Sequence, residues 1–134
     1  MERHETVTTT PIKPQLLAAE LRKHLAPDAI VNCDSGSVTV WWARHVLVKR
    51  GQSHTVSGNL ASTACGLPYA IAAQIAYPHR QCVAFVGDGR FTMLMGELAT
   101  AAHACVGVGS SGGTLRRGPR EGHSGPGKII EGRF

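Results

Sequence analysis

The first strongly periodic part of the chain has leucines at positions 17, 21 and 25. Leucines at this spacing lie on one face of an α-helix, so the segment predicts an amphipathic helix. Pro14 suits the first turn of such a helix, because its fixed backbone angle is helical and its missing N–H needs no partner there. Pro27 ends the pattern. We therefore expect a helix over residues 14–25.

Two later segments are also typical of helices. Residues 67–77, LPYAIAAQIAY, are rich in alanine, with Pro68 near the start and Pro78 just beyond the end. Residues 91–105, FTMLMGELATAAHAC, predict a third main helix, in which Gly96 is a modest weakness.

Strands are expected between these helices. Residues 28–34, DAIVNCD, predict a short strand, followed by the turn SGS and a short helix over 38–46. The polar stretch 49–59 is expected to be a connection. Residues 81–86, QCVAFV, form a continuous apolar run with helices on both sides. A strand of this kind is buried on both faces, which favours a parallel sheet in an α/β fold.

The two ends of the chain differ from this middle part. Residues 1–13 are polar and rich in threonine, which is typical of a linker. Residues 107–134 contain nine glycines and two prolines without apolar periodicity, and we expect them to be disordered. One partial domain is therefore expected over residues 14–106, which suits a chain of 134 residues with 43% hydrophobic side chains.

The net charge of +5 changes this picture little. Residues 1–106 carry nine Lys and Arg against seven Asp and Glu, and residues 107–134 carry five against two. The basic excess thus lies mostly in the tail, without interleaved aromatic side chains. A basic-tailed nucleic-acid binder is an alternative that this pattern supports only weakly.

The cysteines indicate a reducing environment. They contain no Cys-x-x-Cys pair, and we interpret them as small buried hydrophobic residues: Cys33, Cys65, Cys82 and Cys105. No apolar segment has the length of a signal peptide or a membrane span, so the expected location is the cytoplasm, with no membrane contact.

Candidate chemistry lies where the strand over 81–86 ends, at Gly87-Asp88-Gly89. Ligands of parallel sheets bind beyond the carboxyl ends of the strands, and glycines let the backbone approach them closely. Free N–H groups at the start of the next helix favour phosphate, which Asp88 alone would repel. A Mg²⁺ ion between the two resolves this conflict, so the pattern suggests a metal-bridged diphosphate. The alternative is that Asp88 only caps the helix.

Three ordered segments extend this pattern. They are DAIVNCDSGSVTVWWAR (28–44), GLPYAIAAQIAYPHRQ (66–81) and VAFVGDGRFTMLMGELATA (83–101). Together they resemble the cofactor-diphosphate half of thiamine diphosphate-dependent enzymes of the pyruvate oxidase, pyruvate:quinone dehydrogenase and acetolactate synthase group. The resemblance covers roughly residues 12–105. It implies an incomplete three-layer, parallel-sheet thiamine diphosphate-binding fold with a disordered C-terminal tail.

The resemblance also assigns site residues. It implies that Asp88 is a ligand of Mg²⁺. It implies that three segments bind the cofactor: Asp34, Ser35, Gly36 and Ser37 over the diphosphate, Cys65, Gly66 and Leu67 near the thiazolium ring, and Gly87, Asp88, Gly89 and Arg90 around the diphosphate and its metal.

The chain departs from the family pattern in several places. Relatives have a further strand that ends at an Asn pair, which supplies the second Mg²⁺ ligand, but the two asparagines here are Asn32 and Asn59, both upstream. Thr63 stands where relatives have a bulky apolar residue that supports the bent cofactor. Arg90 replaces a small residue, and its cation would either help to hold the phosphate or crowd it. The metal site and the cofactor geometry are therefore expected to be less complete than in the family.

The resemblance finally implies a function. We expect a truncated fragment, the product of a partial gene, that binds thiamine diphosphate and Mg²⁺ and derives from a 2-keto acid decarboxylating enzyme. The intact enzyme would use FAD if it were of the pyruvate oxidase type. The pyrimidine-binding domain with its glutamate would come from a separate domain or a partner chain in a homo-oligomer, so no catalysis is expected from the fragment alone. The alternative is a non-catalytic small subunit that completes its site on another chain.

Overall fold

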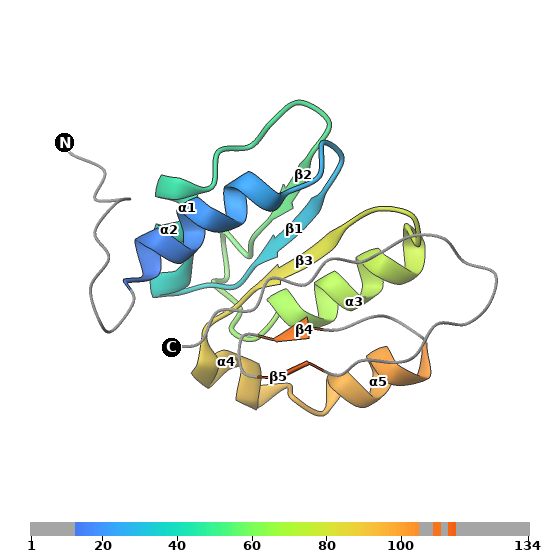
Figure 1. The fold of residues 1–134 in the computed structure, drawn as a ribbon. Helices are drawn as coiled ribbons and strands as arrows, with labels where there is room; N and C mark the ends of the chain where they lie inside the picture. Colours follow the sequence, from blue (N-terminus) through green and yellow to red (C-terminus); the bar gives the residue numbers. More distant parts are fainter. Residues whose placement is uncertain (1–12, 105–108, 111–112, 115–134) are drawn as a thin grey trace.

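The computed structural model describes residues 13–104, 109–110 and 113–114 (Figure 1). Its elements in chain order are α1 (Pro14–His24), β1 (Ile30–Cys33), α2 (Ser37–His45), β2 (Ser53–Thr55), α3 (Gly66–Ala76), β3 (Cys82–Phe85), α4 (Asp88–Met93), α5 (Glu97–His103), β4 (Gly109–Ser110) and β5 (Gly113–Thr114).

The first three strands form one parallel sheet in the order β2-β1-β3. Ile30 at the start of β1 pairs with Ser53 of β2 on one side and with Cys82 of β3 on the other. The short strands β4 and β5 form a separate antiparallel pair. The predicted α/β fold with a parallel sheet is confirmed.

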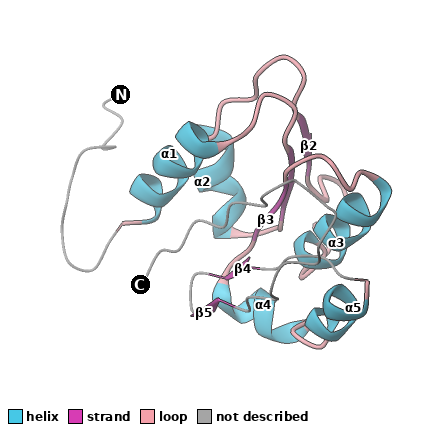
Figure 2. Cartoon of the chain, turned by 45° about the vertical axis from the view of Figure 1, so that its right-hand side comes forward, coloured by secondary structure: helices cyan, strands magenta, loops and turns pink. Residues whose placement is uncertain are grey.

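Helices cover both faces of the parallel sheet, which gives three layers (Figure 2). Helices α1 and α2 lie on one face and helices α3 and α5 on the other. The main core lies between the sheet and helices α1 and α2. Its buried residues are Ala18, Leu21, Leu25, Ala29, Val31, Cys33, Val46 and Phe85. A smaller cluster of Leu67, Ile71 and Ala101, with Phe91 against it, joins α3 to the segment after β3.

Helix α1 forms as its sequence predicts. Lys13 has extended backbone angles and Pro14 occupies the first turn. Leu21 and Leu25 are buried in the main core, and Leu17 packs against it. The helix gives way to extended backbone at Leu25, and Pro27 disfavours helical angles at the next residue, Ala26, so the helix does not continue past this point. The predicted helices at 38–46 and 67–77 likewise correspond to α2 and α3.

The sheet differs from the sequence prediction in two ways. The polar stretch 49–59 contains strand β2, which was expected to be a connection; its sequence, Ser-His-Thr, has no apolar signal because it is a short edge strand. Strand β3 was expected to be buried on both faces, but only Phe85 is buried and the other residues are half-buried. Among the described strands β3 also lies at an edge, and the fully buried strand is β1.

The single helix predicted over 91–105 is wrong. Helix α4 starts earlier, at Asp88, and ends at Met93, and α5 begins at Glu97 after a turn. Gly96, the weak point noted in the sequence, directly precedes α5. The break turns α5 toward α3, so that Ala101 packs with Leu67 and Ile71.

The predicted linker at 1–13 and the predicted disordered tail at 107–134 lie outside the described residues, except for Lys13 and strands β4 and β5. Cys105 also lies outside them. Cys33, Cys65 and Cys82 are free thiols, and burial raises the pKa of the Cys33 thiol to about 12. Within the described part of the chain, no helix combines the length and the apolar character that a membrane span requires.

Candidate functional site

Three segments meet at the carboxyl ends of β1 and β3. They are the turn after β1 (34–37), the loop before α3 (62–66) and the turn after β3 (86–90). The backbone N–H of Asp34 donates a hydrogen bond of 3.1 Å to the carbonyl of Phe85, which continues the pairing of β1 and β3 to the start of both turns. The parallel arrangement thus brings the sequence-predicted segments to one edge of the sheet.

Asp34 organises this edge from inside the protein. Its side chain is completely buried. One carboxylate oxygen accepts a hydrogen bond of 2.8 Å from the backbone N–H of Ser35, and the other accepts one of 3.0 Å from the N–H of Ala64. The Thr39 hydroxyl donates to the Asp34 carbonyl at 2.6 Å. A buried carboxylate that is satisfied by backbone donors is a scaffold element, so Asp34 positions the turn.

The side chains of Ser35 and Cys65 are also used within the protein. The Ser35 hydroxyl donates to the carbonyl of Ser62 at 2.5 Å. The Cys65 Sγ lies 3.3 Å from the same carbonyl and 3.8 Å from an Asp34 carboxylate oxygen. Burial, with the Asp34 charge beside it, raises the pKa of the Cys65 thiol, which keeps it protonated at neutral pH. These groups hold the loop before α3 against β1.

Gly66 lets helix α3 begin very close to the two strand ends. A Cβ on Gly66 would lie 2.7 Å from Val86 Cγ1 and 3.2 Å from the backbone nitrogen of Asp34. A side chain at this position would therefore require neighbouring atoms to shift. Leu67, the next residue, is buried in the smaller cluster and anchors the same helix start.

The turns after β1 and β3 touch each other through Gly36 and Arg90. Gly36 has a φ of +110°, a conformation that favours glycine, and a Cβ at this position would lie 2.5 Å from Arg90 Nη2 and 2.7 Å from Arg90 Cζ. The Arg90 side chain therefore reaches back from α4 and lies against the residue that precedes α2. Gly36 leaves α2 without a side-chain cap, and Ser37 is exposed in its first turn.

Asp88 presents the exposed carboxylate of the site. It is the first residue of α4, directly after Gly87, whose carbonyl accepts hydrogen bonds from the backbone N–H groups of Arg90 and Phe91. A Cβ on Gly87 or Gly89 would meet no atom within 4 Å, so the backbone on both sides of Asp88 is open. Within residues 13–104 no group of three or more His, Cys, Asp or Glu side chains forms a metal cluster.

The two asparagines of the chain lie upstream of Asp88, in β1 and in the connection after β2. Asn32 is buried, and its side-chain oxygen accepts a hydrogen bond of 2.7 Å from the Thr55 hydroxyl. Asn59 lies in the exposed turn at 58–60. Ser62 and Ala64 are the structural partners that sequence reasoning missed, because their contribution is made by backbone groups that carry no side-chain signal.

The sequence of this region matches a known family. Residues 34–108 match the family described as thiamine pyrophosphate enzyme, C-terminal TPP binding domain, and this match covers more than half of the chain. The chain belongs to this family. Thiamine pyrophosphate is another name for thiamine diphosphate, so the resemblance inferred from the three sequence segments is confirmed.

Curated relatives agree with this assignment. The chain is 48% identical over 101 residues to YdaP of Bacillus subtilis (strain 168), a match that covers 75% of this chain and 18% of YdaP. It is 34% identical over 88 residues to the acetolactate synthase large subunit of Lactococcus lactis, covering 66% of this chain and 15% of that protein. It is 34% identical over 90 residues to the pyruvate oxidase of Lactiplantibacillus plantarum, a match that covers 67% of this chain and 15% of that protein. The chain thus spans less than a fifth of the length of these relatives and corresponds to their thiamine diphosphate-binding domain.

The described residues of this thiamine diphosphate-binding domain fit an anionic group. Helix α2 starts without a side-chain cap, and the Nε of Arg90 is buried with no hydrogen-bond partner. Both features supply N–H donors that a phosphate would satisfy. For Mg²⁺ the three segments at this edge of the sheet offer one exposed carboxylate, that of Asp88, which is consistent with an ion held by one carboxylate, phosphate oxygens and water.

Proposed function

We propose that this chain binds the diphosphate of thiamine diphosphate, together with Mg²⁺, at the carboxyl edge of its parallel sheet. The observation that supports this most strongly is the convergence of the turns after β1 and β3, which brings Gly36 and Arg90 into contact beside the exposed carboxylate of Asp88. Open sheets bind phosphate-containing ligands at this kind of position, where adjacent strands lead into helices.

Each segment has a separate task in this proposal. Asp88 is a ligand of Mg²⁺, and the open backbone at Gly87 and Gly89 lets phosphate oxygens approach the metal. The exposed start of α2 at Gly36 and Ser37 donates N–H groups to the diphosphate.

The other site residues support the cofactor indirectly, because they hold the loops that bind it. The buried side chains of Asp34, Ser35 and Cys65 hold the backbone of these loops in place, and Gly66 and Leu67 fix the start of α3 near the thiazolium ring. When bound, thiamine diphosphate supplies the chemistry that decarboxylates 2-keto acids. The chain's own residues bind and orient the cofactor for it.

The activity of the whole protein is a further part of the proposal. The named relatives are an acetolactate synthase and a pyruvate oxidase, and this chain covers 15% of each. We infer that the domain serves a 2-keto acid decarboxylating enzyme of this type, with FAD as an additional cofactor if the enzyme is an oxidase. Catalysis requires a pyrimidine-binding domain, from elsewhere in the protein or from a partner chain, so the 134-residue chain alone binds cofactor without turning over substrate.

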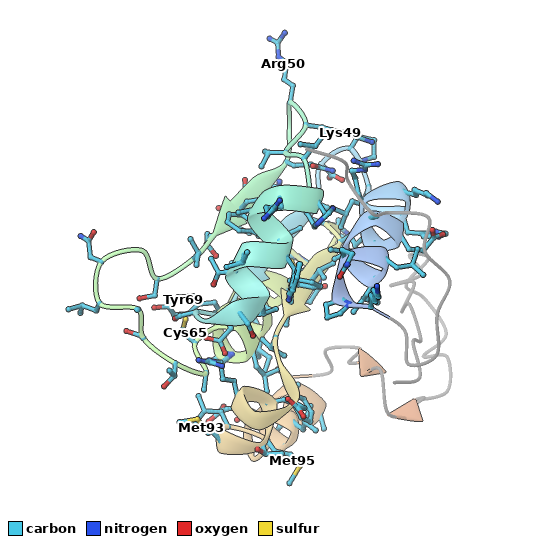
Figure 3. All side chains as sticks on the ribbon, turned by 90° about the vertical axis from the view of Figure 1, so that its left-hand side faces the viewer. Lys49, Arg50, Cys65, Tyr69, Met93 and Met95 are labelled. Carbon is cyan, nitrogen blue, oxygen red and sulfur yellow. The ribbon has the colours of Figure 1, made fainter. Side chains whose placement is uncertain are left out.

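An apolar surface beside the site supports such a partner. Met93, Leu94 and Met95 follow one another at the end of α4, and their side chains are 62%, 37% and 52% exposed. Figure 3 shows Met93 and Met95 at the end of the molecule opposite Arg50. Exposed apolar side chains that lie together favour a protein contact, and methionine adapts well to such surfaces. This surface also fits the alternative in which the chain is a small subunit that completes its site on another protein.

Calorimetric titration of the chain with thiamine diphosphate, with and without Mg²⁺, tests the cofactor proposal. We expect saturable binding that Mg²⁺ strengthens, and we expect Asp88→Asn to remove the strengthening by Mg²⁺. Asp28→Asn is the matched control, because Asp28 is an exposed carboxylate at the other edge of the sheet, just before β1. Absence of binding in a folded sample, or equal effects of the two variants, would contradict the proposal.

A further inference from the structure

The guanidinium of Arg90 stands out because it has no partner. Its Nε is buried without a hydrogen bond, and no ion pair joins Arg90 to any residue in the described part of the chain. Buried polar groups are normally satisfied, and a buried donor left unpaired costs stability. An unpaired guanidinium at a loop junction is therefore a group that a ligand can satisfy.

The position of this cation is unfavourable in the absence of an anion. Arg90 Nη1, Nη2 and Cζ lie 3.0, 2.5 and 2.7 Å from the point where a Cβ on Gly36 would be, and Gly36 directly precedes α2. The start of a helix carries partial positive charge from its free N–H groups, so basic side chains are normally favoured at the other end. A second positive group placed at this start gives a like-charge arrangement that a bound anion would relieve.

The planar guanidinium of Arg90 also suits phosphate in particular. A guanidinium is planar, always charged, and binds two oxygens of a phosphate side by side. The start of α2 adds backbone donors next to it, because the missing side chain at Gly36 lets the guanidinium lie directly against this start. Together they place side-chain and backbone N–H donors side by side, separate from the carboxylate of Asp88.

We propose that Arg90 makes this site a diphosphate receptor that works without a divalent ion. Arg90 and the start of α2 bind the diphosphate directly, and Mg²⁺ at Asp88 adds affinity without being required. This inference rests on the proposed function in that the diphosphate is the one carried by thiamine diphosphate. Arg90 thereby compensates in part for the presence of one exposed carboxylate, that of Asp88, at this edge of the described sheet.

Titration with inorganic pyrophosphate in the presence of EDTA tests this inference, because the probe lacks the thiamine rings and the metal is removed. We expect the full chain to bind pyrophosphate under these conditions, with shifts of the Gly36 and Ser37 amide signals in two-dimensional NMR spectra. We expect Arg90→Gln to weaken binding at least about tenfold, since charge-assisted hydrogen bonds are lost. Arg90→Lys keeps the charge but lacks the planar guanidinium, so its affinity for pyrophosphate is expected to lie between those of the native chain and Arg90→Gln.

Arg50→Gln is the matched control, because Arg50 is exposed in the loop before β2, far from Met93 (Figure 3). It removes the same charge and is expected to change binding less than about twofold, which would separate a local contact from the effect of net charge. The amide spectrum of each variant reports whether the fold is intact.

The outcomes distinguish the two proposals. Equal binding of pyrophosphate by the native chain and Arg90→Gln, or binding that disappears when EDTA is added, overturns the role of Arg90. If thiamine diphosphate with Mg²⁺ still binds in that case, the proposed function stands by itself. If pyrophosphate binds through Arg90 in EDTA but thiamine diphosphate with Mg²⁺ does not bind, the anion site stands and the cofactor proposal fails.

Discussion

The carboxylate of Asp34 and the backbone N–H of Ala64 are joined by a buried hydrogen bond of 3.0 Å, although they lie 30 residues apart in the chain. This bond ties the end of β1 to the loop that starts α3. The same carboxylate also fixes the N–H of Ser35, so a single side chain shapes two of the three segments at the candidate site.

Replacement of Asp34 is expected to destabilise the whole domain. Asp34→Ala leaves the N–H groups of Ser35 and Ala64 buried without acceptors, and we expect a loss of about 2–4 kcal/mol in the free energy of unfolding. Urea denaturation followed by circular dichroism measures this change. Asp88→Ala is the control, because the exposed Asp88 side chain is expected to change stability by less than about 0.5 kcal/mol. Similar losses in both variants would show that Asp34 is not the structural carboxylate.

Replacement of Gly66 by alanine is expected to destabilise the fold. Gly66→Ala places a Cβ 2.7 Å from Val86 Cγ1 and 3.2 Å from the Asp34 nitrogen, so α3 must shift away from the strand ends, at about 1–3 kcal/mol. Gly58→Ala meets no atom within 4 Å and is expected to be nearly neutral. Thermal unfolding of both variants tests the difference. A neutral Gly66→Ala would mean that the helix start is less tightly packed than described.

Ala61 is expected to be better replaced by glycine. Its φ of +48° lies in the left-handed region, where a Cβ is unfavourable, and its side chain is exposed. We expect Ala61→Gly to stabilise the fold by about 0.5–1 kcal/mol. The same change at the exposed helical residue Ala72 is expected to destabilise it by about 0.5–1 kcal/mol. Opposite signs in denaturation midpoints support this account, and equal signs contradict it.

Stability is expected to fall on mild acidification because of His54. The Trp42 indole N–H donates to His54 Nδ1 at 3.0 Å, so the ring is neutral, and burial lowers the pKa of His54 below its ordinary value of 6.5. The unfolded chain therefore binds a proton at His54 more readily than the folded one, and the free energy of unfolding decreases as pH falls through about 6.5. Denaturation midpoints at pH 7.5 and 5.5 measure this decrease.

His54→Gln is expected to reduce this pH dependence, and the exposed His79→Gln is the control that leaves it unchanged. The carboxyl of Glu20 affects stability in a different pH range. Hydrogen bonds from Lys23 and His24 lower its pKa from 4.5, so its contribution to the free energy of unfolding is lost only at more acidic pH. An unchanged pH dependence in His54→Gln would exclude His54 as its source.

Much of this architecture could be predicted from local patterns. Leucine spacing and flanking prolines were sufficient for α1, and the apolar runs were sufficient for β1 and β3, because burial dictates these sequences directly. The polar strand β2 could not be predicted, because an edge strand of three residues has no buried face and therefore no apolar pattern in its sequence. The break between α4 and α5 was signalled only by Gly96, because the packing of Ala101 on α3 determines it.

The candidate site was predictable in its location more than in its internal roles. The residues at 34–37 and 87–90 were expected to share one edge of the sheet, which follows from parallel topology. The inward use of the Asp34 and Ser35 side chains was not predictable, because their partners are backbone groups of Ser62 and Ala64. The contact between Gly36 and Arg90 was not predictable either, since it depends on the path of α4 after β3.

The pairing of β1 with β3 has a consequence for the order of folding. Ile30 and Cys82 become neighbours only after the whole intervening chain, with α2, β2 and α3, has closed into a loop. Contacts of such long sequence separation form slowly and late. We therefore expect the two turns of the site to be assembled late in folding, and we expect pyrophosphate to bind the chains that have completed this step. Added early in refolding, the anion is expected to leave the initial rate unchanged and to slow unfolding.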